Sequence, residues 1–241
     1  MSYERSIDWI GDRPGSGFQQ WLARRLVRRF LGDSQPGLVL EIGTGVGRVA
    51  VEISRLRHHY VGVEPTLSLR SAALARLGTT YQSAKVVNST LPDLPGVADQ
   101  EFSYAMALQV LEHANSSEAA LQWIEGIARK VKPGGRILIV CPNFLDLQGY
   151  FYDVDWTHGW VSTTQRISMV GTEAGLRVFE ELDLRGSFSN PIIKALLCVL
   201  SWCFPTQLVN WVVFRSFKIR NFGTGIQSGL LWRMSWVVFQ R

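Results

Sequence analysis

The sequence is poor in the residues that build disulfide frameworks and metal sites. Its 241 residues include three cysteines and four histidines. The cysteines, at positions 141, 198 and 203, are too few for the framework of a small secreted domain. The histidines, at positions 58, 59, 113 and 158, lack the spacing of a zinc site. We therefore expect a cytosolic protein that holds no metal.

The N-terminal segment also lacks an apolar core of signal-peptide length. Residues 1–17 read MSYERSIDWIGDRPGSG, in which charged and small residues interrupt every apolar stretch. Export is therefore not expected. The predicted location is the cytoplasm, and the basic charge of the chain leaves peripheral contact with the inner face of a membrane open.

Acidic residues are outnumbered by basic ones, and the excess is unevenly distributed. The net charge is +5. The stretch Trp21–Phe30, WLARRLVRRF, predicts a helix with apolar residues on one side and four arginines on another, at positions 24, 25, 28 and 29. Three interpretations are open: a solvated face whose apolar stripe packs on a sheet, a helix that docks on an anionic membrane, or a nucleic-acid-binding helix.

A glycine-rich turn is the most informative motif. Val39–Gly47 reads VLEIGTGVG, an apolar run followed by Gly43, Gly45 and Gly47 and then by a possible helix start. Such a turn lets the backbone approach a nucleotide-like cofactor, with the helix amides pointing at it. Dinucleotide-binding turns need a further glycine where this chain has Arg48, so the spacing favours a cofactor without a pyrophosphate.

Strand and helix patterns alternate along most of the chain, which predicts a parallel sheet. The expected helices cover residues 46–57, 66–77, 116–131 and 163–175, and Lys132-Pro133-Gly134-Gly135 should end the third of them and turn the chain. The expected strands are Leu38–Ile42, His59–Glu64, Ala84–Val87, Phe102–Leu108, Arg136–Cys141, Leu176–Leu184 and Leu230–Arg241.

One long uncharged segment lies before the last expected strand. Ala195–Phe214 has twenty residues without a charge, the length that a bilayer span requires. Because Pro205 and several polar residues interrupt its middle, we expect two short apolar helices that meet at the proline. Three interpretations are open: a buried lid over the active site, a transmembrane helix, or an interfacial hairpin with Trp202 and Trp211 at headgroup depth.

Five segments together resemble the class I S-adenosylmethionine-dependent methyltransferases. They are EIGTGVG, VGVEPT at 61–66, VVNSTLPDLP at 86–95, LQVLEH at 108–113 and VKPGGRILIVCPN at 131–143. The resemblance is strongest to the branch that methylates small molecules, lipids and sugars. It implies an α/β fold, a three-layer Rossmann-like methyltransferase sheet of seven strands with the last strand antiparallel. The apolar helical insertion would lie between strands six and seven.

The resemblance also implies a division of the chain and a set of cofactor contacts. Residues 1–36 would form an N-terminal cap with the basic helix, residues 37–186 plus 229–241 the methyltransferase core, and residues 187–228 the insertion or lid. Glu64 should accept both ribose hydroxyls, because a carboxylate offers two oxygens to a diol. The expected contacts of S-adenosyl-L-methionine are Glu41, Gly43, Thr44, Gly45, Glu64, Pro65, Asn88, Ser89 and Gln109.

Two positions depart from the family pattern, and two histidines are candidates for catalysis. Asn88 and Ser103 stand where the family often has aspartate. If the acceptor is a hydroxyl or an amine, His158 or His113 is a candidate general base, and Asp153 and Asp155 are near enough in sequence to orient the imidazole of His158. The resemblance implies that nucleic acid is not the substrate, because the LQVLEH segment lacks the Asp/Asn-Pro-Pro-aromatic motif of enzymes that methylate bases.

These observations predict methyl transfer to a hydrophobic or membrane-linked small molecule, such as a lipid, a lipid-linked sugar or a secondary metabolite. A non-catalytic partner subunit with the cofactor fold is the leading alternative, and an NAD(P)-dependent enzyme is a weaker one. The acceptor atom and the oligomeric state are left open.

Overall fold

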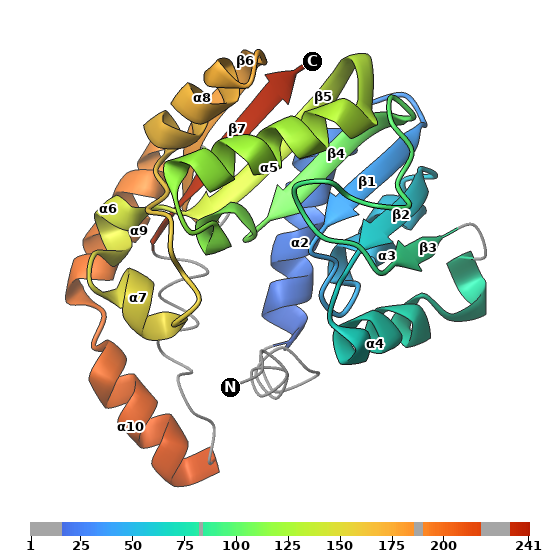
Figure 1. The fold of residues 1–241 in the computed structure, drawn as a ribbon. Coiled ribbons are helices and arrows are strands. Elements are labelled where there is room, and N and C mark those ends of the chain that lie inside the picture. The colour runs from blue at the N-terminus through green and yellow to red at the C-terminus, as the bar shows by residue number, and fades with distance from the viewer. Residues whose placement is uncertain (1–15, 82–83, 186–189, 218–231) are drawn as a thin grey trace.

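The computed structural model describes residues 16–81, 84–185, 190–217 and 232–241 (Figure 1). Some of the predicted features lie outside these residues. Among them are the N-terminal segment before residue 16, the basic residues Lys218 and Arg220 of the insertion, and the start of the last predicted strand at residues 230–231.

A seven-stranded mixed sheet forms the centre of the molecule, with the strand order β3-β2-β1-β4-β5-β7-β6. The first five strands run parallel, and β7 pairs antiparallel with both β5 and β6. This topology confirms the predicted fold class, including the antiparallel last strand. The strands are β1 (Leu38–Ile42), β2 (His59–Val63), β3 (Lys85–Val87), β4 (Phe102–Leu108), β5 (Val131–Pro142), β6 (Arg177–Arg185) and β7 (Arg233–Gln240).

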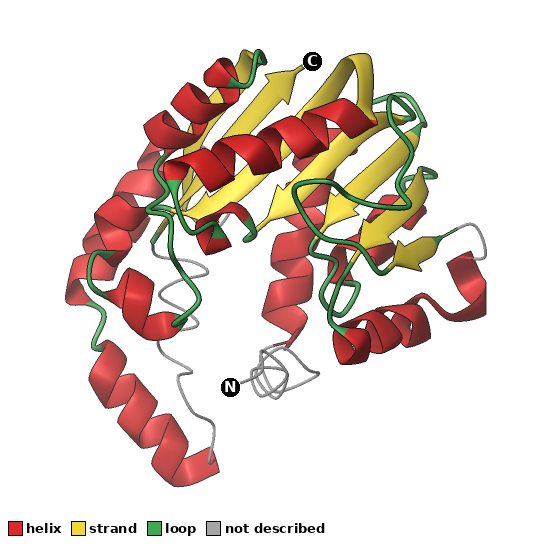
Figure 2. Cartoon of the chain, in the orientation of Figure 1, coloured by secondary structure: helices red, strands yellow, loops and turns green. Residues whose placement is uncertain are grey.

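Helices cover both faces of the sheet and make the fold three-layered (Figure 2). Strand side chains alternate between two apolar clusters, so Leu40 packs with α5 and α8 while Val39 packs with α2 and α3. The longer helices are α2 (Ser16–Leu31), α3 (Arg48–Arg55), α4 (Leu67–Leu77), α5 (Ser117–Lys130), α8 (Thr164–Glu173), α9 (Pro191–Cys203) and α10 (Thr206–Phe217). The short ones are α6 (Phe144–Leu147), α7 (Tyr150–Val154), η2 (Gly78–Tyr81) and η3 (Leu111–His113).

The basic helix predicted at Trp21–Phe30 is the central part of α2. Its apolar stripe, including Leu26 and Val27, is buried against the sheet and α3. Two of its arginines bind carboxylates of the same molecule, since Arg24 lies 3.4 Å from Glu52 and Arg29 lies 2.8 Å from Glu180. The packing interpretation of this helix is therefore confirmed, and two of its four arginines form ion pairs within the molecule.

The segment Lys132–Gly135 differs from its prediction. Helix α5 ends at Lys130, close to the predicted end, but the chain continues directly as strand β5 and does not leave the sheet. Val131 pairs with Phe102, and Arg136 is the next residue to pair, with Tyr104. The predicted turn is therefore a bulge within the strand pair, which the left-handed backbone of Gly134 (φ 78°) allows.

The insertion between β6 and β7 contains two helices, as expected. Helix α9 ends at Cys203 and α10 begins at Thr206, so the interruption falls at Pro205. Within the described ranges, the length and apolar character of each helix fall short of what a bilayer span requires. The transmembrane interpretation therefore has no support from the described helices.

Candidate active site

The glycine-rich turn follows β1 at the carboxyl ends of the parallel strands. Gly43, Gly45 and Gly47 all have left-handed backbones, with φ values of 73°, 54° and 78°. The amides of Gly43 and Thr44 donate to the carbonyl of Val63 in β2, at 2.9 and 3.1 Å. These bonds bend the loop over the ends of β1 and β2, where ligands of open parallel sheets bind.

Glu64 lies at the end of β2 and is almost fully buried. Its two carboxylate oxygens accept hydrogen bonds from the amides of Gly45 and Thr66, each at 2.9 Å. Each oxygen retains a second acceptor direction, so the predicted contact with a ribose diol is stereochemically open and stays a prediction. The structure adds a role that the sequence did not reveal, because Glu64 also fixes the glycine loop.

A buried polar chain supports the loop from below. The hydroxyl of Tyr60 donates to Glu41 at 2.5 Å, and Thr44 lies 3.0 Å from the same hydroxyl. Burial raises the pKa of Glu41 to about 8, although the hydrogen bond from Tyr60 opposes this shift. Glu41 therefore supports the loop through Tyr60 and Thr44, and its expected cofactor contact stays a prediction. Tyr60 is a supporting residue that could not be predicted from the sequence.

The remaining predicted cofactor residues occupy the same edge in different environments. Pro65 and Asn88 are exposed after β2 and β3. Ser89 is buried, and its hydroxyl donates to the carbonyl of Pro95 at 2.9 Å, which gives it a structural contact. Gln109 is exposed after β4 with φ 57°, an uncommon backbone for this residue type that is typical of functional sites.

The two candidate histidines lie side by side, although 45 positions separate them in the sequence. His113 ends the short helix η3, and the loop that carries His158 is pinned to η3 because Gly159 and Trp160 donate their amides to the carbonyl of Glu112. The close approach requires a glycine, since a Cβ at position 159 would lie 2.6 Å from the carbonyl oxygen of Ala114. The ring centroids of the histidines are 5.1 Å apart.

Each imidazole is held by its Nδ1. The Nδ1 of His158 lies 2.5 Å from the carbonyl of Phe151, which can only accept. The Nδ1 of His113 lies 2.8 Å from the Thr157 hydroxyl, and that hydroxyl donates to Asp155. Burial, and then the nearby His158, lower the pKa of His113.

This arrangement differs from the expected one. Asp155 acts on His113 through Thr157 and does not orient the imidazole of His158. Asp153 is exposed on α7, and among the described residues it has no hydrogen bond to either ring. The backbone carbonyl of Phe151 takes the orienting role instead, which a sequence pattern of acidic residues could not reveal.

Glu112 lies in the segment that follows β4 and is not among the residues predicted individually for the site. It is buried close to both histidines and to the Cys141 thiol of β5. Its Oε2 atom is also buried and has no hydrogen-bond partner among the described residues. Burial raises its pKa to about 8. The available signal was a glutamate beside a histidine in the turn after a predicted strand.

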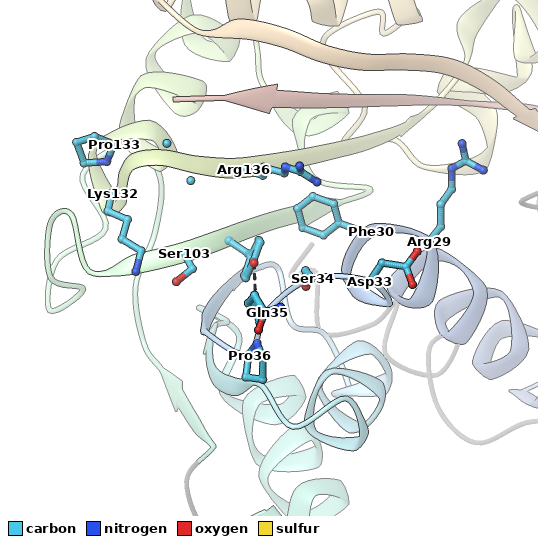
Figure 3. Close-up of a pocket in the computed structure, with 13 residues that line it drawn as sticks. Arg29, Phe30, Asp33, Ser34, Gln35, Pro36, Ser103, Lys132, Pro133 and Arg136 are labelled. Atoms are coloured by element: carbon cyan, nitrogen blue, oxygen red, sulfur yellow. Dashed lines mark hydrogen bonds between the residues drawn. The ribbon is translucent and has the colours of Figure 1, made fainter.

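A separate cavity of about 690 Å³ lies at the opposite edge of the sheet (Figure 3). It is lined by the residues that precede β1, by the start of β4 and by the bulge of β5, and it includes Ser103. Ser103 therefore lies at the amino end of β4, far along the strand from Gln109. Its departure from the family pattern does not alter the cofactor loop.

Comparisons with known proteins agree with this geometry. A family model described as a methyltransferase domain matches residues 17–185, well over half of the chain. No curated protein matches the chain in sequence.

Solved structures share the fold at low sequence identity. A chain from the complex of the Haloferax volcanii Trm112 methyltransferase activator with a proposed methyltransferase has 15% identity and a TM-score of 0.68, over 97% of this chain and 96% of that one. Phosphoethanolamine N-methyltransferase 2 of Haemonchus contortus, in complex with S-adenosyl-L-methionine, has 15% identity and a TM-score of 0.66, over 100% of this chain and 60% of that one. A proposed sarcosine dimethylglycine methyltransferase of Galdieria sulphuraria has 17% identity and a TM-score of 0.61, over 92% and 84%.

The family match favours methyl transfer over the dinucleotide enzyme and the non-catalytic subunit considered from the sequence. The chain belongs to this family of methyltransferase domains, as an enzyme whose cofactor is S-adenosylmethionine.

Proposed function

We propose that the enzyme methylates an apolar or lipid-linked small molecule at the surface of a membrane. The observation that carries this proposal is the exposed apolar face of the insertion helices α9 and α10. Because water solvates such a face poorly, contiguous apolar patches of this kind mark sites of interaction with lipid or apolar ligands.

The apolar face is continuous along α9. Ile192, Leu196, Val199 and Leu200 follow helical spacing, and all four are more than half exposed. On α10 the exposed residues are Leu208, Trp211 and Val212, and the guanidinium of Arg215 lies 5.7 Å from the centroid of the Trp211 ring. An apolar face with a tryptophan and a cation at its border is typical of helices that lie in a membrane interface.

The position of the two helices relates this face to the active site. Arg185 at the end of β6 contacts the Cys198 sulfur at 3.6 Å, which holds α9 against the sheet. In Figure 1, α10 extends on the side toward which the parallel strands point, the side that also carries the glycine loop. A lipid-linked acceptor could therefore reach the cofactor from a surface on which α9 and α10 rest.

The described residues fit S-adenosylmethionine at the glycine loop. A Cβ at Gly45 would meet no atom within 4 Å, so there is open space above this residue, and the Glu64 carboxylate borders it. Glu64 and the loop would hold the ribose and amino-acid portions. The cofactor supplies an activated methyl group, so the protein mainly aligns the acceptor and excludes water.

The histidine pair supplies the acceptor side of the proposed reaction. Because the Nδ1 of His158 must donate to a carbonyl, a neutral ring has its lone pair on Nε2, where it can take a proton from a hydroxyl or an amine. His113 is the second candidate for this role.

Turnover of labelled S-adenosylmethionine against separate lipid, glycan and polar-metabolite extracts tests the proposal. Label should enter the lipid fraction and extract into organic solvent. Incorporation into polar metabolites alone would overturn the substrate class while leaving methyl transfer intact.

The base assignment has its own test. His158→Ala should lower the turnover rate by about a hundredfold with cofactor affinity near normal. His59→Ala is the matched control, because His59 is exposed at the start of β2, away from the site. Normal turnover in both His158→Ala and His113→Ala would show that alignment alone drives the reaction.

A further inference from the structure

Three side chains with metal-binding atoms converge beside the glycine loop. One ligand atom from each of Glu112, His113 and His158 can be chosen so that all three lie within 4.8 Å of one another. The first two come from η3 and the third from the loop after α7, so the fold and not the spacing creates the group.

The glutamate in this group has an unsatisfied atom. The side chain of Glu112 is 1% exposed, and its Oε2 is buried without a hydrogen-bond partner among the described residues. Buried carboxylate oxygens nearly always have a donor or a cation beside them, so an orphaned one indicates a missing partner.

Both imidazoles make through Nδ1 the kind of hydrogen bond that metal-ligating histidines usually make. Ligating histidines donate the N–H of one ring nitrogen to a carbonyl or a carboxylate system and direct the other nitrogen at the metal. His158 donates from Nδ1 to Phe151. Thr157 gives its hydrogen to Asp155 and must therefore accept from the Nδ1 of His113, which places the lone pair of that ring on Nε2.

We propose that Glu112, His113 and His158 bind a divalent transition-metal ion. Two imidazoles and one carboxylate suit Zn²⁺, Mn²⁺ or Fe²⁺ better than Ca²⁺ or Mg²⁺, which prefer sets made of oxygen ligands alone. Three protein ligands also leave coordination positions open for an exogenous oxygen.

The location of the group suggests what such an ion would hold. A Cβ at Gly43 would lie 2.7 Å from Cγ2 of Val110, so the residue that precedes η3 touches the cofactor loop. An ion at the triad would position an oxygen of the acceptor near the methyl donor, and this role rests on the proposed function. Binding of the ion does not rest on the proposed function, because it is inferred from the three ligands alone.

Titration of the apoprotein with Co²⁺, followed by visible absorption, tests the site without cofactor or substrate. One equivalent should produce d–d bands, and Zn²⁺ should displace them. Glu112→Gln, His113→Ala and His158→Ala should each weaken binding tenfold or more, whereas the exposed His59→Ala should bind like the wild type. The proposal would be overturned if one equivalent of Co²⁺ produced no bands, or if all three ligand variants bound Co²⁺ with the affinity of the wild type.

Thr157→Val provides a milder test, since it leaves the three ligands in place. Loss of the hydroxyl that orients His113 should weaken Co²⁺ binding by about 10- to 100-fold, the range typical for groups that orient metal ligands. Circular dichroism and thermal melts establish that the variants are folded. Because Glu112 is buried, its replacement could unfold the chain. In that case His158→Ala is the ligand variant to use, because His158 is only half-buried and its loss should disturb folding less.

A histidine nitrogen that binds a metal cannot also take a proton. Activity with and without metal therefore distinguishes a general-base role of His113 and His158 from a role as metal ligands. If the base role holds, the metal-free enzyme should turn over at least as fast as the loaded one. If the ion holds the acceptor, removal of the metal should raise the KM of the acceptor and leave cofactor affinity unchanged. Failure of turnover with normal Co²⁺ binding would overturn the proposed function and leave the metal site standing.

Discussion

At the residue scale, the Glu64 carboxylate has one observed task and one proposed task. It accepts two backbone amides that shape the glycine loop, and each oxygen keeps a second acceptor direction for the proposed ribose. Because hydrogen bonds to a carboxylate are stronger than those to a neutral acceptor, the loss of this side chain should affect both the loop and the proposed ligand contact.

Glu64→Ala should therefore weaken S-adenosylmethionine binding by about 2–4 kcal/mol. Calorimetry on the folded variant measures this loss, and Glu118→Ala, at an exposed position on α5, is the control. Glu64→Gln should give an intermediate affinity, because its amide group can serve only one of the two N–H donors. Wild-type affinity in Glu64→Ala would remove Glu64 from the cofactor site.

The raised pKa of Glu41 predicts that the stability of the folded chain depends on pH. Burial raises its pKa from 4.5 to about 8 in the folded chain, so the folded state holds a proton that the unfolded chain releases. A group with a raised folded pKa makes stability fall as pH increases through the interval between the two values, here about 4.5 to 8.

Glu41→Gln should make that decline shallower, because the amide keeps the bond from Tyr60 and cannot ionise. Urea unfolding at several pH values between about 5 and 8.5 measures the slope. Parallel curves for the variant and the wild type would contradict the assignment, since Glu112 would then account for the whole dependence.

At the element scale, the glycine loop tolerates side chains unequally. A Cβ at Gly43 would collide with Val110, whereas one at Gly45 would meet open space. Both positions have left-handed backbones, with φ of 73° and 54°, which disfavours a β-branched residue.

Gly43→Val and Gly45→Val should both abolish cofactor binding for these different reasons. The first also displaces the backbone beside η3, so it should lower the melting temperature more than the second. Gly149→Val is the control, because Gly149 precedes α7 with an ordinary helical φ and a Cβ there would meet no atom within 4 Å. Unchanged cofactor affinity in either loop variant would exclude the turn from the site.

The α9–α10 pair predicts binding to lipid surfaces. Flotation with liposomes should require anionic lipid and weaken with salt, because surface charges are screened within about one Debye length of roughly 10 Å at 0.1 M. Leu196→Asp should reduce flotation strongly, whereas Leu74→Asp, at an exposed leucine of α4, should not. Equal flotation of both variants, or none under any lipid composition, would refute the membrane contact.

At the scale of the whole molecule, an ion-pair network joins helix α6 to strands β6 and β7. Asp146 on α6 binds Arg185 of β6 at 2.9 Å and Arg233 of β7 at 2.8 Å, and all three side chains are largely buried. Helix α7, which carries the Phe151 carbonyl that orients His158, follows directly. The network therefore fixes the site as well as the fold.

Asp146→Ala should cost about 3–5 kcal/mol of unfolding free energy, because Arg185 and Arg233 both lose a carboxylate in a largely buried place, although Asp183 stays 3.5 Å from Arg233. Asp153→Ala, at an exposed aspartate of α7, should stay within about 0.5 kcal/mol of the wild type. Chemical denaturation measures both. A loss below about 1 kcal/mol in Asp146→Ala would mean that solvent replaces the carboxylate and that the network is not structural.

Most of the sheet could be predicted because its signals are local. The strands Leu38–Ile42 and Phe102–Leu108 have the predicted bounds, since largely apolar runs suit strands buried on both faces. The bulge at Gly134 could not be predicted, because proline and glycine indicate a turn equally well inside a strand pair or outside it. Helices α6 and α7 were not predicted, because each is too short for a helical repeat of apolar residues to be recognised in the sequence.

The sequence by itself determined the strand-turn-helix unit around Gly43 to Gly47, the position of Glu64 and the apolar character of α9 and α10, because each depends on residues adjacent in the chain. Only the tertiary structure decided that Glu112, His113 and His158 share one site and that Asp155 serves His113. Those contacts arise where the amides of Gly159 and Trp160 bind the carbonyl of Glu112. Hydrogen bonds between distant segments leave no periodic trace in the sequence, so this group of residues is visible only in the fold.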